Sequence, residues 1–225
     1  MNRLAIFDCD GTLVDSGTSI YQAVSETFAE HRIAVPPART CRQVIGLSLV
    51  EAMQALVPEA TAAEHAALTE TYKVKFFQAR AAGQVEEPLF DGIKELLDTL
   101  AADGWLLAVA TGKSDRGLRH CLATHGIASR FISLQTADRH PSKPHPSMAL
   151  QAMTEADAPP EATIVIGDTS FDMGMARASG ATGIGAGWGY HDDAELLAGG
   201  AVAVAESPLD ILQLITRAGV KIDGG

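Results

Sequence analysis

The chain has 225 residues, 47% of them hydrophobic, which is enough for one large domain or for a core domain with a smaller companion. Its 28 acidic and 17 basic residues give a formal net charge of −11, and without any Lys- or Arg-rich run this balance argues against nucleic-acid binding. No apolar stretch approaches the roughly 20 residues that span a bilayer, and the three cysteines form no Cys-x-x-Cys pair. The N-terminal apolar run is too short for a signal peptide, so we expect a cytoplasmic protein without membrane contact or a disulfide framework.

Six short apolar runs predict the strands of a buried sheet. The four strongest lack the alternation of polar and apolar residues that a half-exposed strand would show. Such runs suit a parallel sheet that helices cover on both faces. The strong runs are 4–7, 105–110, 131–134 and 163–166, and the weaker runs are 181–186 and 201–204.

Helical patterns alternate with these runs from residue 87 onward, and the alternation predicts a doubly wound, Rossmann-like α/β domain. Each pattern has a residue suited to the start of a helix. These residues are Asp91, Ser114, Pro146, Phe171 and Ser207, and Gly126 and Gly180 are expected to end the second and fourth helices.

Residues 17–86 contain no convincing strand and are expected to be helical. The signals are the helical spacing of Ile20, Val24 and Phe28 and two capping-box matches, Ser48 to Glu51 and Thr61 to Glu64. This block, here called the cap, interrupts the α/β domain directly after its first strand, so the predicted core comprises 1–16 and 87–225. An insertion at the edge of the sheet where ligands bind favours a lid over a subdomain that only adds stability.

Asp8 and Asp10 directly follow the first predicted strand and form the first candidate site. Alternate strand residues share a face, so the two carboxylates could point toward one site. Two close carboxylates resist joint ionisation, and a hard divalent cation such as Mg²⁺ is the simplest group that offsets this cost. The ends of strands in open α/β sheets are also where ligands bind.

Two further strand ends carry groups suited to a phosphoryl ligand. Thr111 and Gly112 follow the second predicted strand, where a hydroxyl and free backbone amides can hold phosphate oxygens. Lys143 lies in a loop that prolines stiffen, and its ammonium could neutralise a phosphoryl group or keep an acidic nucleophile ionised. Taken alone, Lys143 is better explained as a surface lysine before a helix that starts with proline.

Asp168 follows a later strand, and Asp172 lies one turn into the next helix. Helix capping by Asp168 or Ser170 is one interpretation of this segment. Together with Asp8 and Asp10, however, Asp168 places three carboxylates at two strand ends. This combination favours an Mg²⁺ site with oxygen ligands.

In this order, the segments resemble the motifs of the haloacid dehalogenase superfamily of phosphohydrolases. Residues 8–16 match its first motif, and Thr111, Lys143 with Pro144, and Gly167-Asp168 with Asp172 match the others. The cap is similar to the small domain that one subgroup inserts after its first strand. Within that subgroup, Asp15-Ser16 and residues 46–49 most resemble phosphoglycolate phosphatase-like enzymes.

The resemblance implies an Mg²⁺-dependent phosphatase that forms an aspartyl-phosphate. Asp8 would be the nucleophile, and Asp10 would protonate the leaving oxygen and then activate water. Mg²⁺ would be held by Asp8, the backbone carbonyl of Asp10, and Asp168. The phosphoryl oxygens would be bound by Thr111, the Gly112 amide and Lys143, and Asp172 would orient ligands or waters.

Several rival activities are weighed against this interpretation. Dehalogenases of the superfamily generally lack an acid at position 10, and sugar-phosphate mutases usually carry Arg where Leu49 stands. A phosphonate-cleaving relative would need a cap lysine, for which Lys73 and Lys75 better fit a solvated helix face. A non-catalytic binding protein is disfavoured because Asp8, Asp10 and Lys143 are all present.

The expected partner is a small phosphorylated metabolite, with 2-phosphoglycolate favoured. Arg39 or Arg42 of the cap could meet a carboxylate of such a substrate, although an ordinary surface charge explains either one as well. Pyrophosphate, nucleotides and hexose phosphates are the alternatives. The sequence does not indicate an oligomeric state.

Overall fold

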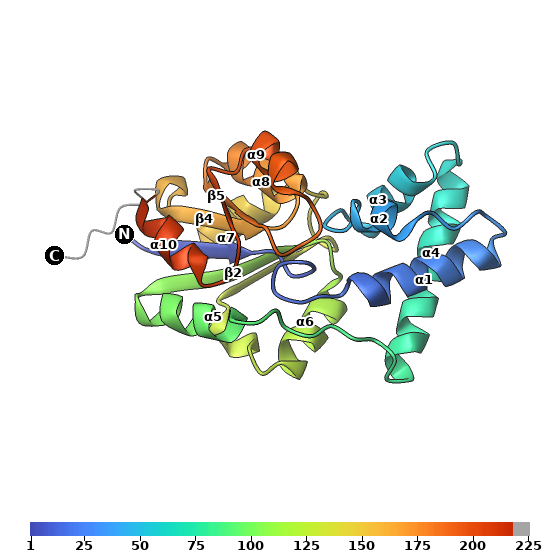
Figure 1. Ribbon diagram of the computed structural model, residues 1–225, viewed down its shortest axis with the longest axis horizontal. Helices are drawn as coiled ribbons and strands as arrows, with labels where there is room; N and C mark the ends of the chain where they lie inside the picture. Colours follow the sequence, from blue (N-terminus) through green and yellow to red (C-terminus); the bar gives the residue numbers. More distant parts are fainter. Residues whose placement is uncertain (218–225) are drawn as a thin grey trace.

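The computed structural model describes residues 1–217 and contains a single six-stranded sheet in the order β3-β2-β1-β4-β5-β6 (Figure 1). Every pairing between neighbouring strands is parallel. The strands are β1 (Arg3–Phe7), β2 (Trp105–Thr111), β3 (Ser133–Thr136), β4 (Thr163–Gly167), β5 (Thr182–Ala186) and β6 (Ala203–Ala205). This sheet confirms the predicted doubly wound α/β fold.

Two strands begin two residues later than predicted. The predicted strand 131–134 is Ser133–Thr136, because Phe131 still closes the 3₁₀ turn Ala128–Arg130. Backbone pairing with β2 then starts where the Ile132 N–H donates to the Leu107 carbonyl. The predicted strand 201–204 is Ala203–Ala205, since Gly200 adopts a φ of 119° at the end of the preceding helix.

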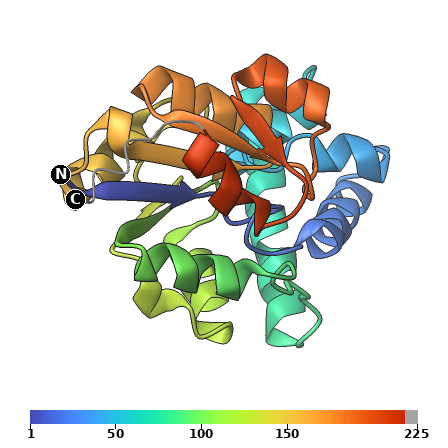
Figure 2. The ribbon, with the colours of Figure 1, turned by 60° about the vertical axis from the view of Figure 1, so that its left-hand side comes forward.

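Helices cover both faces of the sheet. The α-helices within residues 1–217 are α1 (Gly17–Glu30), α2 (Ala38–Arg42), α3 (Leu49–Leu56), α4 (Ala62–Ala81), α5 (Ile93–Ala102), α6 (Asp115–Thr124), α7 (Ser147–Ala156), α8 (Ser170–Ser179), α9 (Asp193–Gly199) and α10 (Asp210–Arg217), and those that cover the sheet follow residue 87. Ala5 and Phe7 of β1 pack with apolar residues of α5, α6 and α10, whereas Leu4 and Ile6 pack with those of α7 and α8. Figure 2 shows α5 and α6 on one side of the sheet and α8 on the other. The period-two alternation of a strand thus supplies both apolar layers.

The predicted helix starts at Ser114 and Thr61 are confirmed. Ser114 accepts a hydrogen bond from the Gly117 N–H, and Thr61 forms a complete capping box with Glu64. The prediction for Asp91 is wrong, since Gly92 occupies the cap position of α5 with a φ of 87°. Ser48 does start α3, but its side chain makes no capping bond, so the capping box predicted from Ser48 to Glu51 is wrong.

Helices α1 to α4 lie beyond the end of the sheet toward which β1 runs (Figure 1). They have an apolar cluster of their own, formed by Val24, Phe28, Cys41, Met53 and Leu68. No helix within residues 1–217 combines the length and the apolar character of a membrane span. The division into a core and a cap agrees with this packing and stays a prediction.

Candidate active site

The carboxyl ends of β1 and β4 bring three carboxylates together. Asp8 follows the last residue of β1, and its backbone N–H donates to the Ile166 carbonyl of β4 at 2.9 Å. Asp168 follows β4, and Asp172 lies in the first turn of α8. One oxygen of each carboxylate lies within 4.8 Å of the other two, and all three residues are buried.

Asp8 has one oxygen that is bound and one that is free. Its Oδ1 accepts a hydrogen bond from the Cys9 N–H at 2.6 Å and lies 3.0 Å from Lys143 Nζ. Its Oδ2 is buried without a hydrogen-bond partner within the described residues. Burial raises the pKa of Asp8 to about 7, and the Lys143 ammonium opposes this rise. An unpartnered oxygen in this position is suited to attack an electrophile or to hold a cation.

Asp168 is held rigidly by its neighbours. The Thr12 hydroxyl donates to Oδ1 at 2.8 Å, and the Tyr190 N–H donates to Oδ2 at 3.0 Å. Gly11 approaches the same carboxylate so closely that a Cβ on this residue would lie 2.1 Å from Asp168 Oδ2. Burial raises the pKa of Asp168 well above its usual range, and the carboxylates of Asp8 and Asp172 raise it further.

Asp172 has both oxygens engaged by the protein. Oδ2 accepts hydrogen bonds from the N–H and the hydroxyl of Thr169, at 3.1 and 2.6 Å, in a capping box that starts α8. Oδ1 lies 2.6 Å from Lys143 Nζ. The predicted capping by Asp168 or Ser170 is therefore wrong, because Thr169 caps this helix. Because both carboxylate oxygens of Asp172 are already bound by Thr169 and Lys143, a positioning role for Asp172 is favoured over metal binding.

Lys143 is not a surface lysine. Its side chain is buried and its Nζ lies between Asp8 and Asp172. Burial by itself would lower the pKa of the ammonium, but the carboxylates of Asp172 and Asp8 raise it above its usual range. Lys143 is therefore positively charged at neutral pH.

The buried charges at this point do not balance. Three carboxylates, Asp8, Asp168 and Asp172, face the single ammonium of Lys143. When the carboxylates are ionised, an excess of two negative charges remains in a buried space, which is costly unless it is compensated. Oxygen donors with this excess fit a hard divalent cation such as Mg²⁺. Asp8 Oδ2, which has no hydrogen-bond partner within the described residues, is an oxygen that such a cation could bind.

The side chain of Asp10 points to a second group of charges. Its Oδ1 accepts a hydrogen bond from the Ser16 hydroxyl and lies 2.8 Å from Lys113 Nζ. The same Nζ lies 2.7 Å from Glu87 Oε1. The carboxylate of Asp10 is thus apart from the three clustered carboxylates. Sequence reasoning missed Lys113 and Glu87, although Lys113 directly follows the predicted Thr111-Gly112 site.

Thr111 and Gly112 lie where the cap meets the core. Thr111 ends β2, is buried, and accepts a hydrogen bond from the Lys113 N–H at 3.3 Å. A Cβ on Gly112 would lie only 2.3 Å from the Leu47 carbonyl oxygen of the cap. The Ser142 hydroxyl also accepts a hydrogen bond from the Ser48 N–H at 2.8 Å. The cap loop therefore rests directly on the predicted phosphate-binding turn.

The two arginines predicted as substrate contacts in the cap stand apart from the carboxylates. Arg39 and Arg42 lie exposed on α2 and form no ion pair with a residue in the range 1–217. Tyr190 and His191, by contrast, contact Asp168, because the Tyr190 N–H donates to its Oδ2 and the His191 N–H donates to its backbone carbonyl. The Tyr190 hydroxyl accepts a bond from the Ser16 N–H at 3.1 Å, and His191 Nε2 lies 3.1 Å from the Gln43 carbonyl oxygen. His191 therefore connects the core to the cap, whereas Tyr190 binds the last residue of the predicted core before the cap begins.

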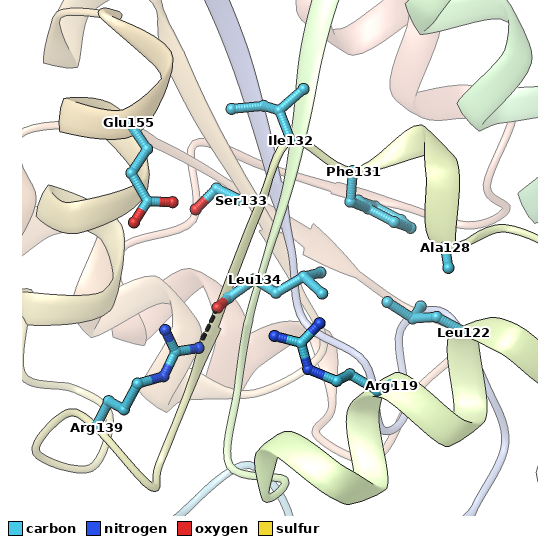
Figure 3. Close-up of a pocket in the computed structure, with 9 residues that line it drawn as sticks. All are labelled: Arg119, Leu122, Ala128, Phe131, Ile132, Ser133, Leu134, Arg139 and Glu155. Atoms are coloured by element: carbon cyan, nitrogen blue, oxygen red, sulfur yellow. Dashed lines mark hydrogen bonds between the residues drawn. The ribbon is translucent and has the colours of Figure 1, made fainter.

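A cavity at the edge of the sheet does not coincide with the carboxylates. It has a volume of about 490 Å³ and lies along edge strand β3, between α6 and α7 (Figure 3). None of its nine lining residues is a predicted site residue. The Arg139 guanidinium donates to the Leu134 carbonyl there, which covers part of the open edge of the sheet. This cavity is better explained by the shape of the sheet edge than by catalysis.

Comparison with known proteins identifies the family. A family model described as "Haloacid dehalogenase-like hydrolase" matches residues 5–186. A protein of Dickeya dadantii named "Probable phosphatase IndB" is 34% identical over 200 residues, covering 88% of this chain and 86% of the relative. A "Phosphoglycolate phosphatase" of Xylella fastidiosa is 30% identical over 194 residues, covering 85% and 83%.

A crystal structure of a hydrolase from Pseudomonas syringae superimposes with a TM-score of 0.83 at 29% identity, covering 96% of this chain and 99% of the other. The chain therefore belongs to the haloacid dehalogenase-like hydrolase family. This membership confirms the resemblance drawn from the motifs.

Proposed function

We propose that this protein is an Mg²⁺-dependent phosphatase that hydrolyses a small phosphomonoester through an aspartyl-phosphate. The observation that carries the proposal is the free, buried Oδ2 of Asp8, beside Lys143 and two residues before a second carboxylate at Asp10. The phosphatase names of the two relatives support the same activity.

In the first step, Asp8 Oδ2 attacks phosphorus and forms a new P–O bond. The bond from phosphorus to the leaving oxygen breaks, and Asp10 gives that oxygen a proton, so that an alcohol departs. Lys143, Thr111 and the Gly112 amide would bind the phosphoryl oxygens and stabilise the charge on them.

In the second step, water replaces Asp8 on phosphorus. Asp10, now a carboxylate, accepts a proton from the water as its oxygen attacks. The bond between phosphorus and Asp8 breaks, which returns the Asp8 carboxylate and releases inorganic phosphate. Asp10 is protonated again, so both residues regain their starting forms.

Asp8 and Asp168, with the backbone carbonyl of Asp10, would hold the metal ion. When bound, Mg²⁺ would supply positive charge that shields the nucleophilic carboxylate from the phosphoryl oxygens. Thr12 and the Tyr190 N–H keep Asp168 in place for this role. Asp172 would keep Lys143 oriented, as its 2.6 Å ion pair indicates.

We favour 2-phosphoglycolate as substrate because of the motif resemblance and the named activity of the Xylella relative. The cap loop lies so close to Gly112 that a Cβ there would be 2.3 Å from the Leu47 carbonyl oxygen, and this closeness favours a small leaving group. The exposed Arg39 and Arg42 give no support to a carboxylate site on α2.

A sugar-phosphate mutase is the second candidate, and Leu49 argues against it. The position where mutases usually carry Arg is occupied by Leu49, which packs against the apolar cluster of the cap. An apolar contact at that position cannot bind a second phosphate or a sugar hydroxyl by charge.

The proposal is tested by measuring phosphate release with and without Mg²⁺ from p-nitrophenyl phosphate and then from a panel of substrates. The panel contains 2-phosphoglycolate, pyrophosphate, a nucleoside monophosphate and a hexose phosphate, compared by kcat/KM. Highest kcat/KM for 2-phosphoglycolate supports the substrate; preference for another member overturns it. If the wild type releases no phosphate while an Asp8→Asn variant binds substrate equally well, the phosphatase proposal fails.

A further inference from the structure

A continuous chain of ion pairs runs from the cap to Asp10. Arg80, in the last turn of α4, lies 2.7 Å from Glu87 Oε2. Glu87 Oε1 lies 2.7 Å from Lys113 Nζ, and the same Nζ lies 2.8 Å from Asp10 Oδ1. The side chains of Asp10, Lys113 and Glu87 are each no more than 10% exposed, and that of Arg80 is 19% exposed. These pairs are therefore less screened by solvent than surface ion pairs.

The chain of ion pairs coincides with the two places where the backbone crosses between core and cap. The outgoing crossing passes Asp15 and Ser16, and the returning crossing passes Glu87 and Pro88. The Asp15 N–H donates to the Pro88 carbonyl at 2.9 Å, which ties the two crossings together. Ser16 from the first crossing binds Asp10 Oδ1 directly, and Glu87 from the second reaches it through Lys113.

The backbone of Lys113 is also bound. Its backbone N–H donates to the Thr111 hydroxyl at 3.3 Å, so the ammonium extends from the predicted phosphate-binding turn. Its Nζ lies between the carboxylates of Asp10 and Glu87, at 2.8 and 2.7 Å. The residue is therefore a fixed positive charge with two carboxylate partners.

At the cap end of this series of ion pairs, Arg80 packs on aromatic side chains of α4. The Arg80 guanidinium lies over the Phe76 ring at 5.0 Å, and the Phe76 ring stacks on Tyr72 at 5.7 Å between centroids. Residues 72, 76 and 80 are spaced by four, so they share one face of α4. Movement of α4 relative to the core would thus displace Arg80 and, with it, Glu87.

We infer that Lys113 is a positioning residue that holds the Asp10 carboxylate by its Oδ1, and that Glu87 and Arg80 make this hold depend on the placement of the cap. The inference rests on the proposed function, in which Asp10 exchanges protons with the leaving group and water. Binding of Oδ1 by Lys113 and Ser16 leaves Oδ2 of Asp10 for those protons. Docking of the cap would in this way set the geometry of the acid–base residue.

The test compares Lys113→Met, Lys113→Arg and Glu87→Gln with a matched control, Lys75→Met. Lys75 of α4 is, like Lys113, a lysine in an ion pair, since its Nζ lies 2.7 Å from Glu30 of α1. This pair joins two helices of the cap and does not reach Asp10. Steady-state kinetics with p-nitrophenyl phosphate and Mg²⁺ give kcat and KM for each variant. Hydrogen exchange of the peptide 76–92 in the substrate-free protein gives a second readout that needs no activity.

We expect Lys113→Met to lower kcat about 10- to 100-fold, with KM changed by less than about threefold, because binding groups stay in place. Lys113→Arg should restore most of kcat, since it keeps the charge. As a single substitution, Glu87→Gln should lower kcat. In a protein that already carries Lys113→Met it should cause no further loss, as expected for residues that act through one series of ion pairs. Exchange over 76–92 should be faster in Lys113→Met and Glu87→Gln and unchanged in Lys75→Met.

The inference would be overturned if Lys113→Met kept the kcat of the wild type. It would also be overturned if Glu87→Gln lowered kcat by the same factor in the wild type and in the Lys113→Met variant. Exchange over 76–92 that matches the Lys75→Met control would overturn it as well. If the wild type hydrolyses no phosphomonoester while exchange responds as expected, the proposed function fails and the link between cap and Asp10 is retained.

Discussion

Asp8→Asn should abolish phosphate release and at the same time make the metal-free protein more stable. Asp8 is 1% exposed and lies beside two other buried carboxylates, Asp168 and Asp172. Burial raises its pKa from the ordinary 3.8 to about 7, which means that ionising it in the folded protein costs free energy. Asn resembles the uncharged carboxyl in shape and avoids this cost.

The size of the effect follows from the pKa. A rise from 3.8 to about 7 corresponds to about 4 kcal/mol of lost stability once Asp8 is ionised in both the folded and unfolded states. The cost is absent below about pH 4, where both states are protonated, and it grows until about pH 7. For a chain of this length, 1 kcal/mol changes Tm by about 2–4 °C, so Asp8→Asn should raise Tm by roughly 10 °C at pH 8.

The assay is thermal unfolding in a chelator at pH 8 and pH 5, with Asp91→Asn as the control because Asp91 is exposed. The gain in Tm should be large at pH 8, small at pH 5, and absent in the control. Added Mg²⁺ should raise the Tm of the wild type more than that of Asp8→Asn, because the cation binds the folded state. An Asp8→Asn variant no more stable than the wild type at pH 8 would refute the reasoning.

Three further substitutions test other parts of the site. Asp10→Asn should lower kcat for p-nitrophenyl phosphate about 10²- to 10⁴-fold, the usual worth of general acid–base catalysis, while circular dichroism stays unchanged. Lys143→Met should destabilise the metal-free protein by about 3–5 kcal/mol in urea unfolding at pH 8, because it leaves buried carboxylates uncompensated. Gly112→Ala should lower kcat/KM about 10- to 100-fold, because a Cβ there would lie 2.3 Å from the Leu47 carbonyl oxygen and must displace the cap loop.

Each of these predictions has an outcome that contradicts it. Wild-type turnover by Asp10→Asn would remove that residue from the proton transfers. Lys143→Met should be far more costly than Lys94→Met, whose lysine is exposed on α5, and equal stabilities would contradict the charge balance. Unchanged kcat/KM in Gly112→Ala would show that the cap loop does not constrain the site.

Local chemistry makes part of this structure predictable. Apolar runs separated by helical patterns predict the parallel sheet, and the side chains of Ser114 and Thr61 predict helix starts because capping bonds span only three residues. The convergence of Asp8 and Asp168 also follows, since parallel strands end at the same edge of a sheet. Gly92 was not predicted as the cap of α5 because its left-handed backbone conformation, and not a side chain, makes the cap, and the capping bond predicted for the Ser48 side chain does not form.

The sequence by itself therefore determined the fold class and the set of residues at the strand ends. Only the tertiary structure decided how those residues share their bonds: Lys143 is buried between Asp8 and Asp172, while Asp10 faces Lys113. Glu87 enters the site from the return crossing of the cap, and no local pattern marks it. Such partners are distant in the chain, and their pairing depends on how the cap packs on the core, which short-range periodicity and capping signals do not encode.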